Sequence, residues 1–546
     1  MRVIICAIVV AVASAAVAIR PPSIDDAVDY RTTAAQANRV ASQWGAAAGG
    51  VHYAKTLTRP IEGFRSWERD SPREEGGAPS GFDSTAADYL IEKGFPIPAL
   101  ADVMKTKIEA ATWMVRSFTP GQKDESFVEV DPRIARVIGY HRMQEQKKPG
   151  PRLAQAAATS IAQAAFPRFG VDLNAFELKE ALAFQQPNRL DWLFHFQERR
   201  QIAAEAYRRI SVRVQGNEVT QFTTTVKIPD PFYREANAQT LLNVIFQVLK
   251  LVGFLAALSL VVAGFVVAAR KNRFPWRRPL RWTAVLAIVP IVAALLRWNS
   301  TLFAYDTSIG WDTFITSLII RLITQMGFQI GLIFLALAGI DAVYPHALDL
   351  PRRQARARVG RAALVAALTA IGCFLIRRVV LQVVMLRFPS VAWTDGIAVP
   401  LAVATPMPFL LGIGEALVRA VEASAAFALF VAALRGANRR WLPAAAAALV
   451  VFLISLDAGV TIHQTGLMLL SAVSAGVVVW LIAEYVLRDN LAAYPLTIAM
   501  ILILNQAGAL LQNDRADLQT AAFIEIAAAI ALAIWVAAPR ANPENA

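Results

Sequence analysis

The stretch GEALVRAVE at residues 414–422 decides the fold, because it places three charges inside a run of apolar residues. Its charged positions are spaced i, i+4 and i+7, so a helix projects Glu415, Arg419 and Glu422 from one face. A charge near the middle of a bilayer costs about 3 kcal/mol, and such side chains normally face a protein interior or water. The stretch therefore predicts either an internal Glu-Arg-Glu salt bridge that locks helices together or a present or former active site.

Composition places this stretch in a membrane protein. Of the 546 residues, 56% are hydrophobic and only 17% are charged, a balance typical of membrane proteins. Residues 20–240 carry 29 basic and 27 acidic side chains, whereas long apolar runs with short basic loops follow from Leu241. The net charge of +13 therefore indicates membrane topology and not a nucleic-acid-binding surface.

The first residues predict export of the segment that follows them. Arg2 precedes an apolar, alanine-rich run that ends in small residues, which favours a signal peptide or an uncleaved N-terminal anchor at residues 1–19. In both cases residues 20–237 form an extracytoplasmic domain, for which we expect an α+β fold.

Within this domain, two similar units of helix, strand and hairpin are predicted. The Trp-centred strand and the Val-rich hairpin of each unit resemble PepSY-like units, which lie outside many bacterial membrane peptidases and are thought to inhibit them or present substrate. A generic α+β packing domain is the alternative. The first unit has a helix at 32–44 and strands at 112–118, 127–131 and 135–140, and the second a helix at 153–166 and strands at 191–196, 210–214 and 218–222.

Residues 238–546 predict a polytopic helical bundle of about nine spans, since one crossing takes about 20 apolar residues. The loop at 270–281 carries six basic residues and no acid, and the loop at 351–358 is also purely basic. The positive-inside rule places both loops in the cytoplasm and the N-terminal domain outside, at a bacterial inner membrane. Three prolines at 400, 406 and 408 predict a broken or re-entrant piece before the helix of Glu415.

Other polar side chains also fall at membrane depth. They predict either a hydrophilic cavity at the centre of the bundle or a set of interhelical hydrogen bonds. These residues are Lys250, Arg321 with Gln325 and Gln329, Asp457, Glu484, Asn505 with Gln506, and Glu525.

The helix of Glu415 resembles the CPBP family, the CAAX-protease and bacteriocin-processing intramembrane peptidases. That family carries Glu-Glu-x-x-x-Arg, then Phe-x-x-x-His on the next helix, then a further His with Asn one turn on. Glu415 and Arg419 keep one glutamate and the arginine of the first motif, whereas its other glutamate is missing. After Phe452, Leu456 stands at the first histidine position.

The resemblance implies an intramembrane endopeptidase that has lost part of its catalytic set, with Glu415, Arg419 and Glu422 as a vestigial motif. Such a degenerate member would bind or regulate a transmembrane protein or peptide. His463 lies outside the motif register, and no histidine comes one turn before Asn505. We therefore expect the lipid bilayer and a transmembrane protein or peptide as partners, no nucleic acid, and no cofactor, with a zinc-type metal only in an active enzyme.

Two alternatives stay open. The first is an active intramembrane protease with a nonstandard set of Glu415, Glu422 and His463, because an acid and a histidine are groups that activate water. The second is a transporter-like or scaffold membrane protein, which the proline-broken segment beside membrane charges favours.

Overall fold

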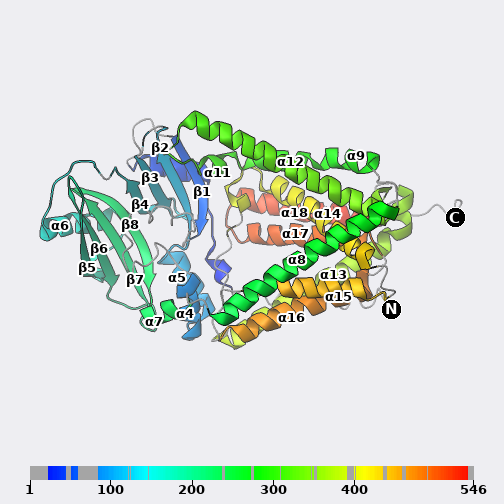
Figure 1. The fold of residues 1–546 in the computed structure, drawn as a ribbon. Helices are drawn as coiled ribbons and strands as arrows, with labels where there is room; N and C mark the ends of the chain where they lie inside the picture. Colours follow the sequence, from blue (N-terminus) through cyan, green and yellow to red (C-terminus); the bar gives the residue numbers. More distant parts are fainter. Residues whose placement is uncertain are drawn as a thin grey trace.

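The chain forms an antiparallel sheet domain followed by a bundle of long helices (Figure 1). This arrangement confirms the predicted fold class of an N-terminal α+β domain on a polytopic helical bundle. The predicted signal peptide or anchor lies outside the residues described, as do residues 396–398 and Pro400 of the predicted proline-broken piece. The rest of that piece is a short 3-10 helix at Leu401–Ala404, followed by a helix that starts at Pro408. The computed structural model describes residues 23–44, 51–58, 84–120, 122, 124–145, 147–236, 240–271, 276–307, 309–345, 347–349, 353–389, 399, 401–434, 439–457, 463–487 and 490–538.

Eight strands form one continuous antiparallel sheet in the order β1-β2-β3-β4-β8-β7-β6-β5. The two halves meet where β4 pairs with β8, with Tyr140 opposite Phe222 and His141 opposite Gln221. The strands are β1 (Val51–Thr58), β2 (Ala111–Phe118), β3 (Glu125–Val130), β4 (Val137–Met143), β5 (Phe176–Gln185), β6 (Leu190–Glu198), β7 (Tyr207–Gln215) and β8 (Glu218–Lys227).

In the chain, a helix precedes the strands of each half of the sheet. Helix α2 (Ala34–Ser42) precedes the first half and α6 (Gln155–Ala165) precedes the second. One helix and four strands thus occur twice, so the predicted three strands per unit were one too few. The missing strands are β1 and β5, and β5 has the sequence FELKEALAFQ, whose residues mostly favour helix. Between β1 and β2 the chain adds two further helices, α4 (Ser84–Glu92) and α5 (Ile97–Thr106).

Among the described residues, the bundle contains eight stretches that are long and apolar enough to cross a membrane. Helices α9 and α10 together form one of them, and the separate helix α15 has only 13 residues, about 20 Å of helix. From the sheet onward the helices are α7 (Asp230–Ala236), α8 (Leu241–Lys271), α9 (Arg277–Leu286), α10 (Ile288–Leu296), α11 (Trp298–Leu302), α12 (Trp311–Val343), α13 (Arg353–Arg387), η6 (Leu401–Ala404), α14 (Pro408–Leu434), α15 (Leu442–Ile454), α16 (Thr465–Leu481), η8 (Ile482–Leu487), α17 (Ala493–Leu511) and α18 (Ala516–Ala537).

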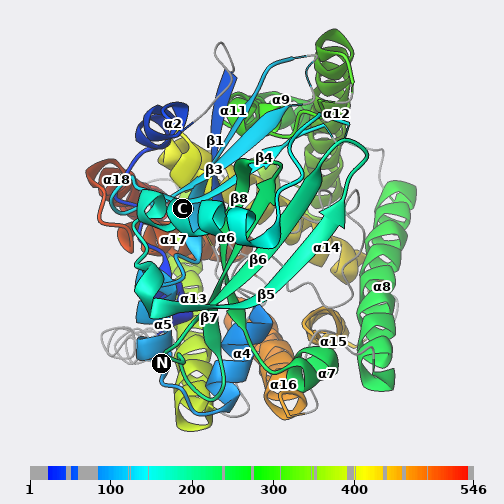
Figure 2. The ribbon, with the colours of Figure 1, turned by 90° about the vertical axis from the view of Figure 1, so that its left-hand side faces the viewer.

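Helices α8 and α12 separate toward the sheet (Figure 1). At the end of the bundle distal to the sheet, Ala268 of α8 and Ile340 of α12 share a buried cluster with Leu429 of α14. Nearer the sheet, Phe246 of α8 packs in a cluster with Leu453 of α15 and Met468 of α16. Phe314 of α12 instead packs in a cluster with Phe118 of β2. Figure 2, viewed from the sheet end, shows α8 and α12 at separate edges of the molecule.

The sheet docks on the bundle through the turn between α17 and α18. Asn513 is fully buried, and its side-chain oxygen accepts a hydrogen bond from the Tyr30 N–H at 2.8 Å. Arg515 donates to the carbonyl oxygens of Thr32 at 2.9 Å and Val403 at 3.0 Å. These bonds join the chain before α2, the short helix η6 and the start of α18, so the sheet is packed on the bundle and not only tethered to it.

A second contact joins β2 to the end of α11. The buried Arg116 pairs with Glu125 at 2.7 Å, and its Nη1 donates to the carbonyl oxygen of Phe303 at 2.6 Å. Phe118 packs on Tyr305, with 5.0 Å between the ring centroids. Burial raises the pKa of Glu125, although the positive charge of Arg116 acts in the opposite direction.

Candidate functional site

The carboxylate of Glu415 forms an ion pair with a helix that the motif did not predict. Arg297 lies at the junction of α10 and α11, and its Nη2 donates to Glu415 Oε1 at 2.5 Å. Both side chains are partly exposed, 36% for Arg297 and 38% for Glu415. Arg297 was not among the predicted polar groups at membrane depth, because it follows directly after the apolar run that ends at Leu296 and so lies outside the predicted span. Its position next to Trp298, at the end of a span, was the available signal.

Arg419 and Glu422 share the face of Glu415 but do not close the predicted Glu-Arg-Glu salt bridge. Arg419 is exposed and Glu422 is partly buried, near the middle of the 27-residue helix α14. Within the described part of the chain, no ion pair of 4 Å or less reaches either side chain. The three residues therefore form a charged face of α14 in which only Glu415 is neutralised by an ion pair.

The other predicted polar groups are distributed over several helix pairs. Arg377 of α13 donates to the Ser471 carbonyl oxygen at 2.7 Å and to Ser474 Oγ at 3.0 Å, both on α16. Arg378 lies 3.5 Å from Asn505 Oδ1. Arg321 and Gln325 are exposed on α12. These groups form separate interhelical hydrogen bonds or face outward, and do not converge on one hydrophilic cavity.

The nonstandard catalytic set is not assembled. His463 is exposed in the turn before α16, and no described carboxylate pairs with it. Leu456, at the histidine position of the family motif, is buried in an apolar cluster with Phe246. Among the described residues, no three His, Cys, Asp or Glu side chains come together in a group that could hold a metal ion.

Glu525 of α18 is the group at membrane depth to which the sequence assigned no role. It has no exposed surface, and neither carboxylate oxygen has a hydrogen-bond partner in the described structure. It packs directly on Gly412 of α14, where a methyl group would overlap Glu525 Oε1 and come within 2.9 Å of Gln506. Gly412 thus provides the space that the carboxyl group occupies.

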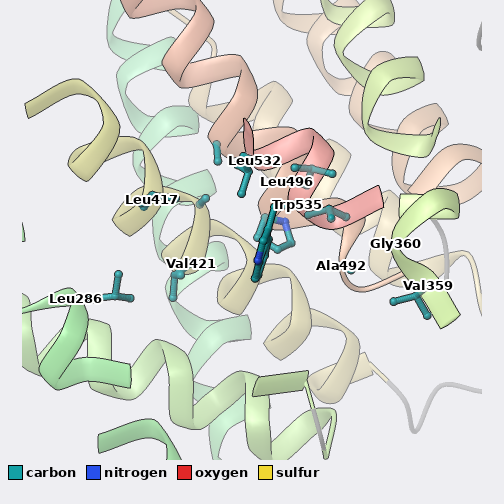
Figure 3. A pocket seen from close by; sticks show the side chains of 13 residues that line it. Leu286, Val359, Gly360, Leu417, Val421, Ala492, Leu496, Leu532 and Trp535 are labelled. Atoms are coloured by element: carbon teal, nitrogen blue, oxygen red, sulfur yellow. The ribbon is translucent and has the colours of Figure 1, made fainter. Parts of the chain in front are cut away.

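An apolar cavity of about 200 Å³ lies between α9, α13, α14, α17 and α18. Figure 3 shows the Trp535 ring between the labelled side chains, with Leu417 and Val421 contributed by α14. None of the described residues that line the cavity is charged. At 3.6 residues per turn, Leu417 and Val421 point away from the face of Glu415, so this cavity is separate from the charged face.

Comparisons of the chain with protein-family models, with curated proteins and with solved structures give no match. The resemblance to CPBP peptidases and to PepSY-like units therefore stays a prediction. The assignment as an integral membrane protein rests on the eight long apolar helices.

Proposed function

We propose that the protein is a bacterial inner-membrane protein that binds a transmembrane segment of another protein at the charged face of α14, without cutting it. This face is formed by Glu415, Arg419 and Glu422. The proposal includes a sheet domain outside the cytoplasm and descent from a CPBP-type intramembrane peptidase.

Arg419 carries the proposal. An arginine side chain stays ionised in proteins, and at the middle of a span it costs about 2.5 to 3.5 kcal/mol on insertion scales. Arg419 is exposed, and the described residues offer it no ion pair. A transmembrane segment with an acidic or amide side chain at the same depth would supply the missing partner.

The arrangement of the motif residues favours binding over hydrolysis. Glu415 is engaged by Arg297 at 2.5 Å, whereas a general base has to reach and deprotonate a water molecule. Gly414 and Leu456 stand where the family motif has a glutamate and a histidine. A site that keeps the charges but lacks the water-activating groups fits a protein that recognises a segment and leaves it intact.

The proposed orientation follows from the basic junctions at the end of the bundle distal to the sheet, such as the one between α8 and α9. It is tested with single cysteines at Glu177 on β5, whose side chain is 41% exposed, and at Trp276, exposed before α9, in a background without native cysteines. A membrane-impermeant maleimide added to spheroplasts should label Glu177→Cys and not Trp276→Cys. The opposite labelling would reverse the orientation.

The binding proposal is tested by photo-crosslinking in the native membrane. A photoreactive phenylalanine replaces Ala423, which is exposed one turn after Arg419, and a control probe replaces Phe523, 63% exposed on α18. We expect a discrete protein adduct from position 423 that is lost with Arg419→Gln and absent from position 523. An adduct that appears only as a shortened product would favour the active protease, and lipid adducts alone at both positions would refute partner binding.

A further inference from the structure

Glu525 is a buried acid without a counter-charge. It lies on α18, has no exposed surface, and offers two carboxylate oxygens that no described donor reaches. An ionised carboxylate in such a place is strongly disfavoured, because burial removes its hydration and nothing replaces it. The neutral acid is the form that these surroundings can hold.

The surroundings are built from small and neutral side chains on three helices. Gly412 of α14 lies against the carboxyl group, with Gln506 of α17 beside it. Ala522 and Ala529, one turn on either side of Glu525 on α18, are also buried. The packing is close enough that a methyl group on Gly412 would not fit, so the acid fills a site shaped for it.

The titratable groups on the helices that pack against α18 are already placed elsewhere or remain apart from Glu525. Glu415 pairs with Arg297, Arg377 bonds to α16, and Arg378 lies at Asn505. No described ion pair reaches Glu525. The remaining such groups are Arg419 and Glu422 on α14, Tyr494 on α17, and Arg353, Arg356, Arg358, Arg361, Cys373 and Arg387 on α13.

We infer that Glu525 is a proton-binding site in the bundle, which carries H⁺ as a neutral carboxylic acid at neutral pH. Release of the proton to water leaves a carboxylate in the contact between α14 and α18. That contact then has to admit water or a cation, so proton occupancy sets how closely the two helices pack. This inference is independent of whether the face of Arg419 binds a partner.

A metal ion is a poor alternative occupant. Hard cations take six or more oxygen ligands, and the described residues contain no group of three potential ligands among His, Cys, Asp and Glu. The proton requires only the carboxylate that is present.

Infrared spectroscopy of the full-length protein in lipid nanodiscs tests the inference. At neutral pH the wild type should show the carbonyl stretch of a protonated carboxylic acid. Glu525→Gln, which has the same shape as the neutral acid, should lose this band, whereas Glu415→Gln should keep it because Glu415 is ion-paired. An unchanged band in Glu525→Gln, or no acid band in the wild type at neutral pH, would overturn the inference.

A second measurement covers the case in which Glu525→Gln does not fold. The wild type and Glu525→Asp are both labelled with carbon-13 glutamate and titrated upward from neutral pH. The variant keeps an acid at position 525, but this acid does not carry the label. The labelled acid band should persist in the wild type until alkaline pH and be missing in Glu525→Asp. Conversion to the carboxylate already complete at neutral pH would contradict proton binding.

Discussion

The guanidinium of Arg297 lies 2.5 Å from the carboxylate of Glu415, although 118 positions separate them in the chain. The pair ties the junction of α10 and α11 to the first half of α14. Because α11 ends next to Phe303, whose carbonyl oxygen accepts from Arg116 of β2, the sheet and the charged face of α14 are connected through one short helix.

We expect Arg297→Gln and Glu415→Gln to be coupled. Each single change removes one partner and leaves the other charge alone inside the bundle, whereas the double change removes both. For a pair that is about one third exposed, the coupling free energy should be about 1 kcal/mol. The free energy of unfolding in mixed micelles, measured for the two single variants and the double variant, checks this value. Strictly additive effects would show that the contact contributes no stability, and Arg321→Gln, on an exposed face of α12, is the control.

Arg515→Ala should loosen the sheet from the bundle. The change leaves the buried carbonyl oxygens of Thr32 and Val403 without their donor, at a cost of about 1 to 3 kcal/mol each. Hydrogen exchange should accelerate at the Tyr30 amide, which is bonded to Asn513 in the same turn. The matched control is Thr520→Ala, because Thr520 is exposed and its hydroxyl donates to the carbonyl oxygen of Ala516 within α18. Equal exchange in the two variants would refute a docking role for Arg515.

The sheet domain should lose stability in mild acid through His141. Burial, with Arg213 as a second cause, lowers the pKa of His141 from 6.5 to about 3. The unfolded chain therefore binds a proton in this range that the folded chain does not, so the contribution is complete above pH 6.5 and falls as the pH drops toward 3.

The measurement for His141 is the thermal midpoint of unfolding between pH 7 and pH 4. His141→Gln should show a shallower decline than the wild type, and His463→Gln, at an exposed turn, should follow the wild type. Parallel curves for wild type and His141→Gln would contradict the predicted linkage.

Local patterns were sufficient to predict the architecture. A membrane span is encoded by a continuous apolar run, and a hairpin is encoded by alternating apolar and polar residues on both sides of a turn. The strands at 210–214 and 218–222 were predicted in this way, and Gly216 in the turn between them has a positive φ of 61°. Strand β5 was missed because Glu, Lys, Ala and Leu favour helix, and pairing with β6 outweighs that preference.

The contacts of the candidate site could not be predicted in the same way. Spacing placed Glu415, Arg419 and Glu422 on one helical face, but it carries no information about which helix lies opposite. The pairing of Glu415 with Arg297 and the packing of Glu525 on Gly412 each depend on how distant spans are arranged.

Gly412→Ala should destabilise the bundle. The added methyl group would overlap the carboxyl group of Glu525, and such overpacking costs about 1 to 3 kcal/mol. Gly508→Ala on α17 is the matched control, since nothing lies within 4 Å of its added methyl group. The free energy of unfolding of both variants is the measurement, and equal values would show that Gly412 is not needed to accommodate Glu525.

Exchanging the charge of Arg419 with that of an acidic residue in the captured segment, the transmembrane segment that crosslinks to position 423, tests the proposed function most directly. With the photoreactive probe at Ala423, Arg419→Glu should abolish the protein adduct. Replacing the acidic residue of the captured segment by lysine should restore the adduct with Arg419→Glu and weaken it with wild-type Arg419. An adduct that is indifferent to the charge at position 419 would contradict the account, because recognition would then not depend on the unpaired charge of α14.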